Sequence, residues 1–517
     1  MTIKLTRRGL LATASAASTF ALGGGARVRA QPAAPIRLAA ERRTLDINGK
    51  AATVFGLRQP DGSPGISLAS GQRFLVELAN QTSEETIVHW HGQTPPVRQD
   101  GVADTGLEAL IPPGSRQAYD YAARPGTHWM HSHHGLQEQI LMAAPLVVRT
   151  AEDARADLQE VVVLLHDFTF RDPREILAGL TGAADAARAA QAMPGGATSG
   201  LPMGSGHMEG MPTGGHAMSG MSMGGHAQAP MAAMPGGRST ARTGMVMDLN
   251  DIDYDAYLAN DRTLADPVVV RTERKGRVRL RLINGATSTA FWLDLGALEG
   301  TIVAVDGNPV RPLAARQFPI AQGQRVDVVL QMPSSGGAFP VLAQREGDRQ
   351  RTGIILATPG ARVEKVAEAA GQAVGAVDLS LERRLQAMQP LAPRRADIVH
   401  RIALTGMMQP YRWGIDGRTW AHGQPLVVSQ GWRVEVEMVN RSQMAHPMHL
   451  HGHHFQVLAL NGTPIAGAMR DTVLVPVHGS VRVAFDADNP GRWLFHCHNL
   501  YHMATGMMTE LAYSDFV

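Results

Sequence analysis

Cysteine is nearly absent from this sequence, since Cys497 is the only one among its 517 residues. A single cysteine forms no internal disulfide, so the fold cannot depend on one. In an exported protein, a thiol that escapes oxidation is best explained as a metal ligand. A buried structural cysteine is the alternative, but it does not account for the histidines and methionines that surround Cys497.

The sequence also lacks a hydrophobic run long enough to span a bilayer. The N-terminal apolar stretch, residues 10–22, is short and rich in Ala and Ser. Arg7 and Arg8 precede it, and Ala30 ends a small-residue cleavage site. This pattern is typical of a twin-arginine signal peptide. We therefore expect residues 1–30 to direct the chain to the periplasm through the twin-arginine export machinery, with no membrane anchor.

Neither sign of charge dominates the remaining chain. Residues 1–30 hold five of the 48 basic residues and none of the 46 acidic ones, which leaves a net charge of about −3 without them. Proteins that bind nucleic acid or an anionic membrane surface usually carry a basic excess. The charge balance therefore indicates neither kind of partner.

One strand-like pattern occurs three times. In each copy, hydrophobic and polar residues alternate after a turn glycine and run into an asparagine, which predicts a half-buried β-strand. The copies are FLVELANQTS (74–83), VRLRLINGATS (278–288) and VEVEMVNRSQ (434–443). Helical periodicity is weak elsewhere. The length and this repeat predict an all-β chain of three Greek-key β-sandwich domains.

The repeat also predicts the domain boundaries. The three asparagines, Asn80, Asn284 and Asn440, are 204 and 156 residues apart, so the first interval contains an insertion. We expect domain 1 at 31–150 and domain 2 at 151–360, with the insertion at about 190–243. A linker at 361–396 then precedes domain 3 at 397–517.

The insertion is rich in Met, His and Gly. Nine of the 25 methionines and three histidines fall between residues 193 and 234, separated by Gly, Ser and Pro. Such a composition cannot form a packed core and predicts disorder. Thioethers are soft ligands that select Cu(I), so we interpret the insert as a copper-collecting segment. The alternative is a flexible loop with incidental methionines.

The segment HCHNLYHMATGMM, residues 496–508, concentrates metal-binding side chains. Cys497, His502 and Met507 are the parts of a blue-copper site, which is completed by a histidine from elsewhere. The segment HPMHLHG, residues 446–452, offers candidates. In a strand, neighbouring side chains face opposite sides, so Cys497 can bind one metal while the histidines beside it reach others.

Two histidine pairs lie near the N-terminus, in HWHG (89–92) and in HSH (131–133). Spacing of two residues puts both rings of a pair on one face of a strand. Taken together and in order, the four motifs resemble those of the three-domain multicopper oxidases. The resemblance covers nearly the whole chain after the signal peptide and implies three cupredoxin-like domains.

The resemblance also implies a complete set of ligands for four copper ions: one type 1, one type 2 and a type 3 pair. The type 1 ligands are His446, Cys497, His502 and axial Met507. The type 2 ligands are His89 and His449. The type 3 ligands are His91, His131, His133, His451, His496 and His498. We interpret His128, His134, His453 and His454, which lie beside the ligands, as packing or rim residues rather than metal ligands.

In this family, electrons pass from the type 1 copper through Cys497 to His496 and His498. Because ligand motifs occur only in the first and last copies, we expect the cluster between domains 1 and 3, with domain 2 as a spacer. O2 reduction consumes protons, so an acid is needed nearby. Asp100 matches a proton-relay aspartate of the cuprous oxidases, or it is simply a turn residue before Gly101.

Two positions depart from the cuprous-oxidase branch. Met503 and Ser442 stand where that branch carries acids. The stretches SHHGLQEQ (132–139) and MAHPMHLHG (444–452) resemble the periplasmic copper-resistance branch more closely. We therefore predict a periplasmic oxidase that couples one-electron oxidation of Cu(I), and of phenolic substrates, to the reduction of O2 to water, for copper tolerance.

Other functions remain open. One alternative is a laccase-like phenol oxidase, and another is non-enzymatic copper sequestration through the Met-rich insert. A cell-division scaffold of the same fold is disfavoured, because a scaffold would be expected to have lost some of the twelve ligands.

Overall fold

The computed structural model describes residues 34–182 and 249–516. The predicted signal peptide (1–30) and the predicted insert (190–243) lie outside the described residues. Helices in the described ranges are short: α1 (Ala151–Arg155), α2 (Pro173–Thr181), α4 (Leu500–Ala504), η1 (Val97–Gln99), η2 (Gln137–Ile140) and η3 (Trp420–His422). None of them has the length and apolar character needed to cross a membrane.

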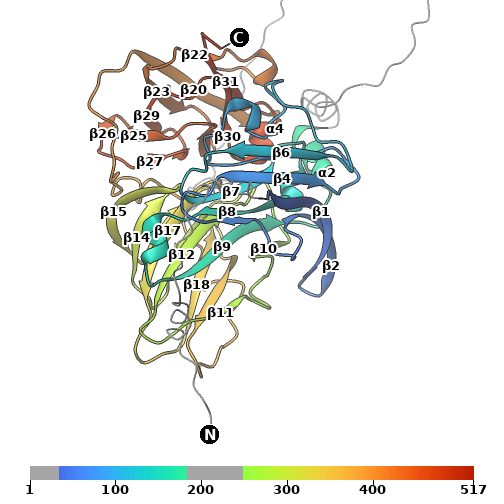
Figure 1. Cartoon of the computed structure of the whole chain (residues 1–517), viewed down its shortest axis with the longest axis vertical. Helices are drawn as coiled ribbons and strands as arrows, with labels where there is room; N and C mark the ends of the chain where they lie inside the picture. The colour runs from blue at the N-terminus through green and yellow to red at the C-terminus, as the bar shows by residue number, and fades with distance from the viewer. Residues whose placement is uncertain (1–33, 183–248, 517) are drawn as a thin grey trace, which may run out of the picture. The chain divides into compact units, whose positions relative to one another are not determined.

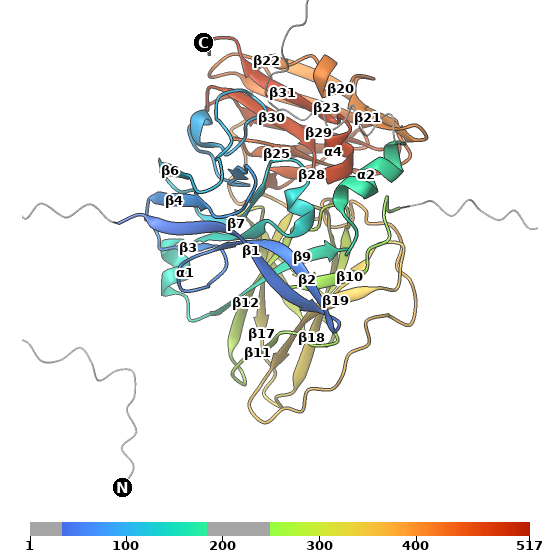
Figure 2. The same cartoon turned by 90° about the vertical axis from the view of Figure 1, so that its right-hand side faces the viewer.

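Strands form six sheets, which pair into three sandwiches that can be followed by colour in Figures 1 and 2. The first sandwich has sheets of order β2-β1-β4-β6 and β3-β8-β7-β5. Its strands are β1 (Ile36–Ile47), β2 (Lys50–Arg58), β3 (Ile66–Leu68), β4 (Phe74–Asn80), β5 (Val88–His89), β6 (Arg116–Tyr121), β7 (Gly126–Ser132) and β8 (Ala143–Val148).

The second sandwich has sheets of order β10-β9-β12-β17-β14-β15 and β11-β19-β18-β13-β16. Its strands are β9 (Gln159–Phe168), β10 (Ala256–Ala259), β11 (Val269–Arg271), β12 (Arg277–Asn284), β13 (Phe291–Asp294), β14 (Gly300–Val305), β15 (Asn308–Ala315), β16 (Gln317–Ile320), β17 (Arg325–Gln331), β18 (Ala338–Arg345) and β19 (Arg351–Ala357).

The third sandwich has sheets of order β21-β20-β23-β29-β25-β26, with β27 paired to β25, and β22-β31-β30-β24-β28. Its strands are β20 (Ile398–Met408), β21 (Tyr411–Ile415), β22 (Leu426–Val428), β23 (Arg433–Asn440), β24 (His446–Leu450), β25 (Phe455–Leu460), β26 (Thr463–Pro464), β27 (Met469–Arg470), β28 (Thr472–Val475), β29 (Ser480–Asp486), β30 (Arg492–Cys497) and β31 (Met508–Tyr513).

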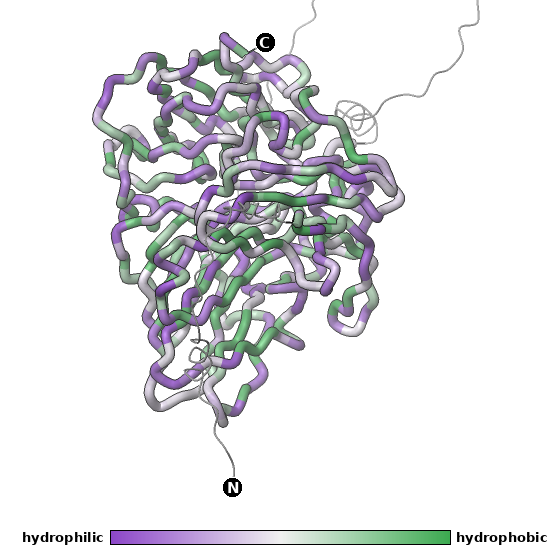
Figure 3. The backbone as a smooth tube through the Cα atoms, viewed as in Figure 1, coloured by the Kyte–Doolittle hydropathy of each residue, from purple (hydrophilic) through white to green (hydrophobic). Residues whose placement is uncertain are grey.

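The repeated pattern in the sequence corresponds to one strand of each sandwich, β4, β12 and β23. Each pairs in parallel with the first long strand of its sandwich and antiparallel with a later one. Along β4, buried and half-buried residues alternate, and Phe74 and Val76 join Leu146 of the opposite sheet in one apolar core. Figure 3 shows hydrophobic and hydrophilic stretches interchanging along the strands. The predicted all-β fold of three sandwiches is confirmed.

A buried asparagine ends each repeated strand, and in all three strands its side chain bonds the backbone of the loop that follows. The side-chain oxygens of Asn80, Asn284 and Asn440 each accept a hydrogen bond from the backbone N–H two residues on, at 2.9, 3.1 and 2.9 Å. Each side-chain amide donates to a backbone carbonyl further along the loop. Asparagine suits such turns because its short amide replaces backbone partners. In the third sandwich, this loop leads into β24, which carries predicted ligands.

Candidate metal centres

The predicted type 1 ligands converge at one end of the third sandwich. Strands β24 and β30 are paired, with Met448 opposite Cys497, so His446 and Cys497 lie on the same face. His502 comes from α4, where the side chain of Asn499 caps the first turn and accepts a hydrogen bond from the His502 N–H. His446, Cys497 and His502 are all fully buried.

The donor atoms of these three residues face one another. The Nδ1 atoms of His446 and His502 are 3.1 Å apart, and Cys497 Sγ lies 3.6 and 3.7 Å from them. Each imidazole uses its other nitrogen elsewhere: His446 Nε2 bonds the Ser442 hydroxyl at 2.7 Å, and His502 Nε2 lies 3.2 Å from an Asp251 oxygen. The Nδ1 lone pairs are therefore free for a metal.

Cys497 requires a cation to ionise at this position. Burial raises the pKa of its thiol well above the ordinary value, so the free side chain stays protonated. A bound metal ion reverses this effect and holds the thiolate. Met507 is buried in the same segment, and its backbone bonds both Cys497 and His502. The axial role of Met507 stays a prediction.

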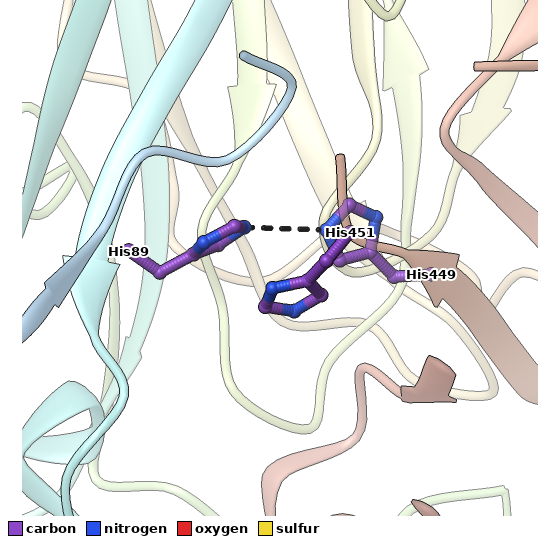
Figure 4. A group of neighbouring side chains, drawn as sticks. All are labelled: His89, His449 and His451. Atoms are coloured by element: carbon purple, nitrogen blue, oxygen red, sulfur yellow. Dashed lines mark hydrogen bonds between the residues drawn. The ribbon is translucent and has the colours of Figure 1, made fainter. Parts of the chain in front are cut away.

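The eight other predicted histidine ligands gather between the first and third sandwiches. They come from β5, β7, β24 and β30 or from the residue or two after these strands. Three groups have ligand atoms within 4.8 Å of one another: His89, His449 and His451; His91, His131 and His498; His133, His451 and His496. Figure 4 shows the first group, in which the Nε2 atoms of His89 and His449 are 3.5 Å apart.

Unpartnered nitrogens show that this cluster suits metal ions. Within residues 34–182 and 249–516, His91 Nδ1, His131 Nε2, His133 Nε2 and His498 Nε2 are buried without a hydrogen-bond partner. Buried polar atoms are normally satisfied, so unpaired nitrogens inside a ring of histidines match metal ligands. The opposite nitrogens of His91, His131 and His133 lie 3.2, 2.9 and 3.2 Å from carboxylate oxygens of Asp471, Glu138 and Asp104. Such outer bonds fix the tautomer that leaves a lone pair facing the centre.

The protonation state of the cluster agrees with metal binding. Burial, reinforced by charged neighbours, lowers the pKa of His91, His131, His449, His451 and His496 well below the ordinary value. Burial also lowers the pKa of His498 to about 3. Neutral imidazole is the form that binds a metal, so these rings need not lose a proton first.

Asp100 is buried beside the cluster. Its Oδ2 accepts a hydrogen bond from His451 Nδ1 at 2.8 Å, and its backbone oxygen accepts one from His89. Asp100 also precedes Gly101, whose φ is +79° and whose Cα hydrogen faces the Val88 carbonyl so closely that a side chain has no room. Asp100 is therefore the turn residue before Gly101, and its carboxylate also contacts a predicted ligand. Its proton-relay role stays a proposal.

Four further carboxylates contact predicted ligands, although the motifs did not indicate them. Glu138 Oε2 lies 2.9 Å from His131 Nδ1, and burial raises the pKa of Glu138 well above its ordinary value. Asp104 contacts His133, and Asp471 contacts His91, both at 3.2 Å. Asp251 contacts His502. Only Glu138 and Asp104 lie near a histidine motif in the sequence, and acids at such positions are too common to signal a site.

The four neighbouring histidines interpreted as packing residues, His128, His134, His453 and His454, belong to none of the metal-ligand groups found among the described residues. Two of them have protein partners that account for both ring nitrogens. His454 donates from Nε2 to the Gly92 carbonyl and accepts from the Asn308 amide. His453 bonds the Tyr513 hydroxyl and the His451 carbonyl.

The chain matches three family models, each described as multicopper oxidase, over residues 40–153, 222–360 and 394–516. The multicopper oxidase MmcO of Mycobacterium tuberculosis is 29% identical over 482 residues, covering 91% of this chain and 85% of that protein. Copper resistance protein A of Escherichia coli is 24% identical over 585 residues, covering 91% and 89%. Laccase-1 of Botryotinia fuckeliana is 22% identical over 527 residues, covering 92% and 82%.

Solved structures have the same fold. Fet3p, described as a multicopper oxidase that functions in iron import, gives a TM-score of 0.69 at 16% identity and covers 92% of this chain and 90% of its own. The laccase from Botrytis aclada gives 0.69 at 19% identity, with 92% and 87% covered. The sandwiches are therefore cupredoxin-like. The chain belongs to the multicopper oxidase family, and it is an oxidoreductase that uses copper cofactors.

Proposed function

We propose that this protein is a periplasmic multicopper oxidase that protects against copper by oxidising Cu(I), with phenols as additional reductants, and reducing O2 to water. The observation that carries the proposal is the position of Cys497. It lies in one donor group with His446 and His502, and its chain neighbours His496 and His498 lie in two groups of the other centre. A short covalent path thus joins the two centres.

When bound, one type 1, one type 2 and a type 3 pair of coppers would supply the one-electron oxidation and the reduction of O2. The protein's part is to hold the donor atoms and to exclude water. The ring nitrogens that face inward are buried, and hydrogen bonds to Asp100, Asp471 and Cys497 fix three of the rings.

Asp251 supports the proposal that a cationic reductant donates its electron to the type 1 copper through His502. Its carboxylate contacts His502 Nε2 and accepts hydrogen bonds from Tyr411 at 2.9 Å and Asn499 at 2.7 Å. Burial opposes ionisation, but His502 and these hydrogen bonds hold the pKa of Asp251 below its ordinary value. An anionic carboxylate beside the predicted type 1 site favours a cationic reductant such as Cu(I) over a neutral phenol.

The described residues on either side of the predicted insert also support Cu(I) as the reductant. The described chain resumes at residue 249, two residues before Asp251. Before the insert, α2 contacts β21, and the centroids of the Trp413 ring of β21 and the His502 ring are 4.0 Å apart. The described residues that flank the predicted insert in the sequence therefore lie near His502 on both sides.

Phenol oxidation is the second candidate, because relatives named laccase cover most of this chain. O2 uptake by the copper-loaded protein distinguishes the reductants. We expect one O2 consumed for every four Cu(I) oxidised, without hydrogen peroxide, since four electrons and four protons convert O2 to two waters. O2 uptake with phenols but not with Cu(I) would make phenol oxidation the better assignment.

Periplasmic delivery depends on Arg7 and Arg8 if the N-terminus is a twin-arginine signal. Changing both residues to Lys is expected to leave most of the protein in the cytoplasm, as measured by cell fractionation. The natural sequence, expressed in parallel, is the control. Undiminished periplasmic delivery of the double variant would contradict this route.

Asp100 is expected to supply protons for O2 reduction. An Asp100→Asn side chain can still accept the hydrogen bond of His451, but it cannot act as an acid. General acids typically contribute at least about 100-fold to a rate, so we expect reoxidation of the reduced protein by O2 to slow by that order. Stopped-flow spectroscopy should show that anaerobic reduction of the blue copper keeps its rate. Normal reoxidation, with a slow Glu138→Gln variant, would reassign the role to Glu138.

A further inference from the structure

Arg325 joins the second sandwich, which carries no predicted copper ligand, to the histidine cluster. It begins β17 and is fully buried. Its guanidinium forms two parallel bonds with Asp471 of the third sandwich, from Nη1 to Oδ1 at 2.7 Å and from Nη2 to Oδ2 at 2.5 Å. Bidentate pairing of this kind fixes the plane of the carboxylate.

Asp471 in turn contacts histidines from two different sandwiches. Its Oδ1 lies 3.2 Å from His91 Nε2, and its backbone oxygen accepts a hydrogen bond from His449 Nδ1 at 2.9 Å. The rings of His91 and His449 are stacked at 3.7 Å with an angle of 11° between their planes. Asp471 therefore orients one predicted type 3 ligand and one predicted type 2 ligand together.

The ligand atoms of Asp471, His91 and His449 lie within 4.8 Å of one another, a spacing that would also allow Asp471 to bind a metal ion. Its hydrogen bonds argue against this assignment. Both of its side-chain oxygens are engaged by Arg325, and the Thr472 hydroxyl also donates to Oδ1 at 2.9 Å. The carboxylate is thus an acceptor that orients the His91 ring, and the Asp471 backbone oxygen orients the His449 ring. The inner nitrogens, His91 Nδ1 and His449 Nε2, have no oxygen partner.

The second sandwich contacts the cluster at two more points. Arg325 Nε donates to the Thr127 carbonyl at 3.2 Å, on the strand that carries His131. Gly323 has a φ of +78°, and a side chain there would lie 2.8 Å from a His498 ring carbon and 3.2 Å from one of His91. The interpretation of the second sandwich as a spacer is therefore incomplete.

We propose that Arg325 is a positioning residue of the trinuclear centre, which acts through Asp471 to set the orientation of His91 and His449. This inference rests on the proposed copper centres. It assigns the second sandwich a direct part in holding the type 2 copper and its type 3 neighbour. Orienting partners beyond the ligands typically change metal affinity by about 10- to 100-fold.

The test compares Arg325→Met with Arg281→Met. Arg281 is an equally buried arginine of the second sandwich that pairs with Asp327 at 2.9 Å and also contacts Thr127, but it bonds neither Asp471 nor a predicted ligand. Loss of Arg325 leaves the buried Asp471 without its arginine, whereas Asp327 keeps a bond from Arg279 when Arg281 is lost. Arg281→Met therefore controls for removing a buried arginine from the second sandwich, and the free energy of unfolding of both variants is measured. Arg325→Lys, which keeps the charge, serves if Arg325→Met does not fold.

We expect Arg325→Met to change the type 2 electron paramagnetic resonance spectrum and to lose type 2 copper to a chelator about 10- to 100-fold faster. The blue band of the type 1 copper should stay unchanged. Arg325→Lys should restore part of the type 2 signal, and Arg281→Met should keep all of it. If the unsubstituted protein itself binds no type 2 copper, the proposed function is wrong and the role of Arg325 does not arise. The inference is overturned by an unchanged type 2 spectrum in Arg325→Met, or by an equal change in Arg281→Met.

Discussion

A Cys497→Ser variant is expected to lose the intense blue absorption and all oxidase turnover with both Cu(I) and phenols. Cys497 is the only thiol in the chain, and its Sγ lies 3.6 and 3.7 Å from the Nδ1 atoms of His446 and His502. A serine hydroxyl at this position is not a soft ligand, and it cannot supply the thiolate character on which blue copper depends. Absorption spectroscopy and O2 uptake measure the two losses.

The fold and the second centre should survive this substitution. Serine is close to cysteine in size, and none of the eight cluster histidines is altered. Type 2 and type 3 copper should therefore stay bound and visible by spectroscopy. A His453→Gln variant, changed at a buried histidine outside the metal-ligand groups of the described residues, should keep both the colour and the turnover. A Cys497→Ser protein that still oxidises substrate would remove Cys497 from the electron path.

Deletion of residues 190–243 is expected to lower Cu(I) oxidation and copper tolerance several-fold. Nine methionines and three histidines lie in the segment, and thioethers bind Cu(I) preferentially. All predicted core ligands lie outside it, so the core coppers should remain. A phenol needs no thioether, so phenol oxidation should be unchanged or faster. A variant in which the nine methionines become leucine separates the loss of thioethers from the loss of chain.

The result of this deletion decides between the candidate functions. Unchanged Cu(I) turnover and tolerance would show that the segment does not deliver copper, and phenol oxidation would become the better assignment. A third outcome is possible with the Cys497→Ser variant. If deletion abolishes tolerance but Cys497→Ser keeps it, then sequestration rather than catalysis provides the protection.

Local motifs made the predicted ligands recognisable in the sequence. His89 and His91, or His131 and His133, lie two residues apart, a spacing that predicts one face of a strand. The second histidine of each pair in fact lies just beyond its strand, because β5 ends at His89 and β7 at Ser132. The three strands ending in Asn80, Asn284 and Asn440 were also predictable, because alternation and the turn asparagine are local features. Strand order was not predictable, since alternation indicates which face is buried but not which strand lies beside it.

The residues around the ligands could not be found in this way. Asp251 and His502 are separated by 251 residues, and Arg325 and Asp471 by 146. Their contacts exist only because three sandwiches meet, and single acids or arginines carry no signature in sequence. The second sandwich was predicted to be a spacer because it has no histidine motif. Arg325 nevertheless bonds Asp471, and Gly323 lies against the rings of His498 and His91.

The copper content of the fully loaded protein tests the central claim most directly. Elemental analysis against protein concentration, combined with electron paramagnetic resonance, counts the ions and separates the types. Twelve ligands are predicted, and eleven of them fall in the metal-ligand groups, which implies four coppers per chain. One type 1 and one type 2 copper should give electron paramagnetic resonance signals, and the coupled type 3 pair should give none. One or two coppers per fully loaded chain would contradict the account.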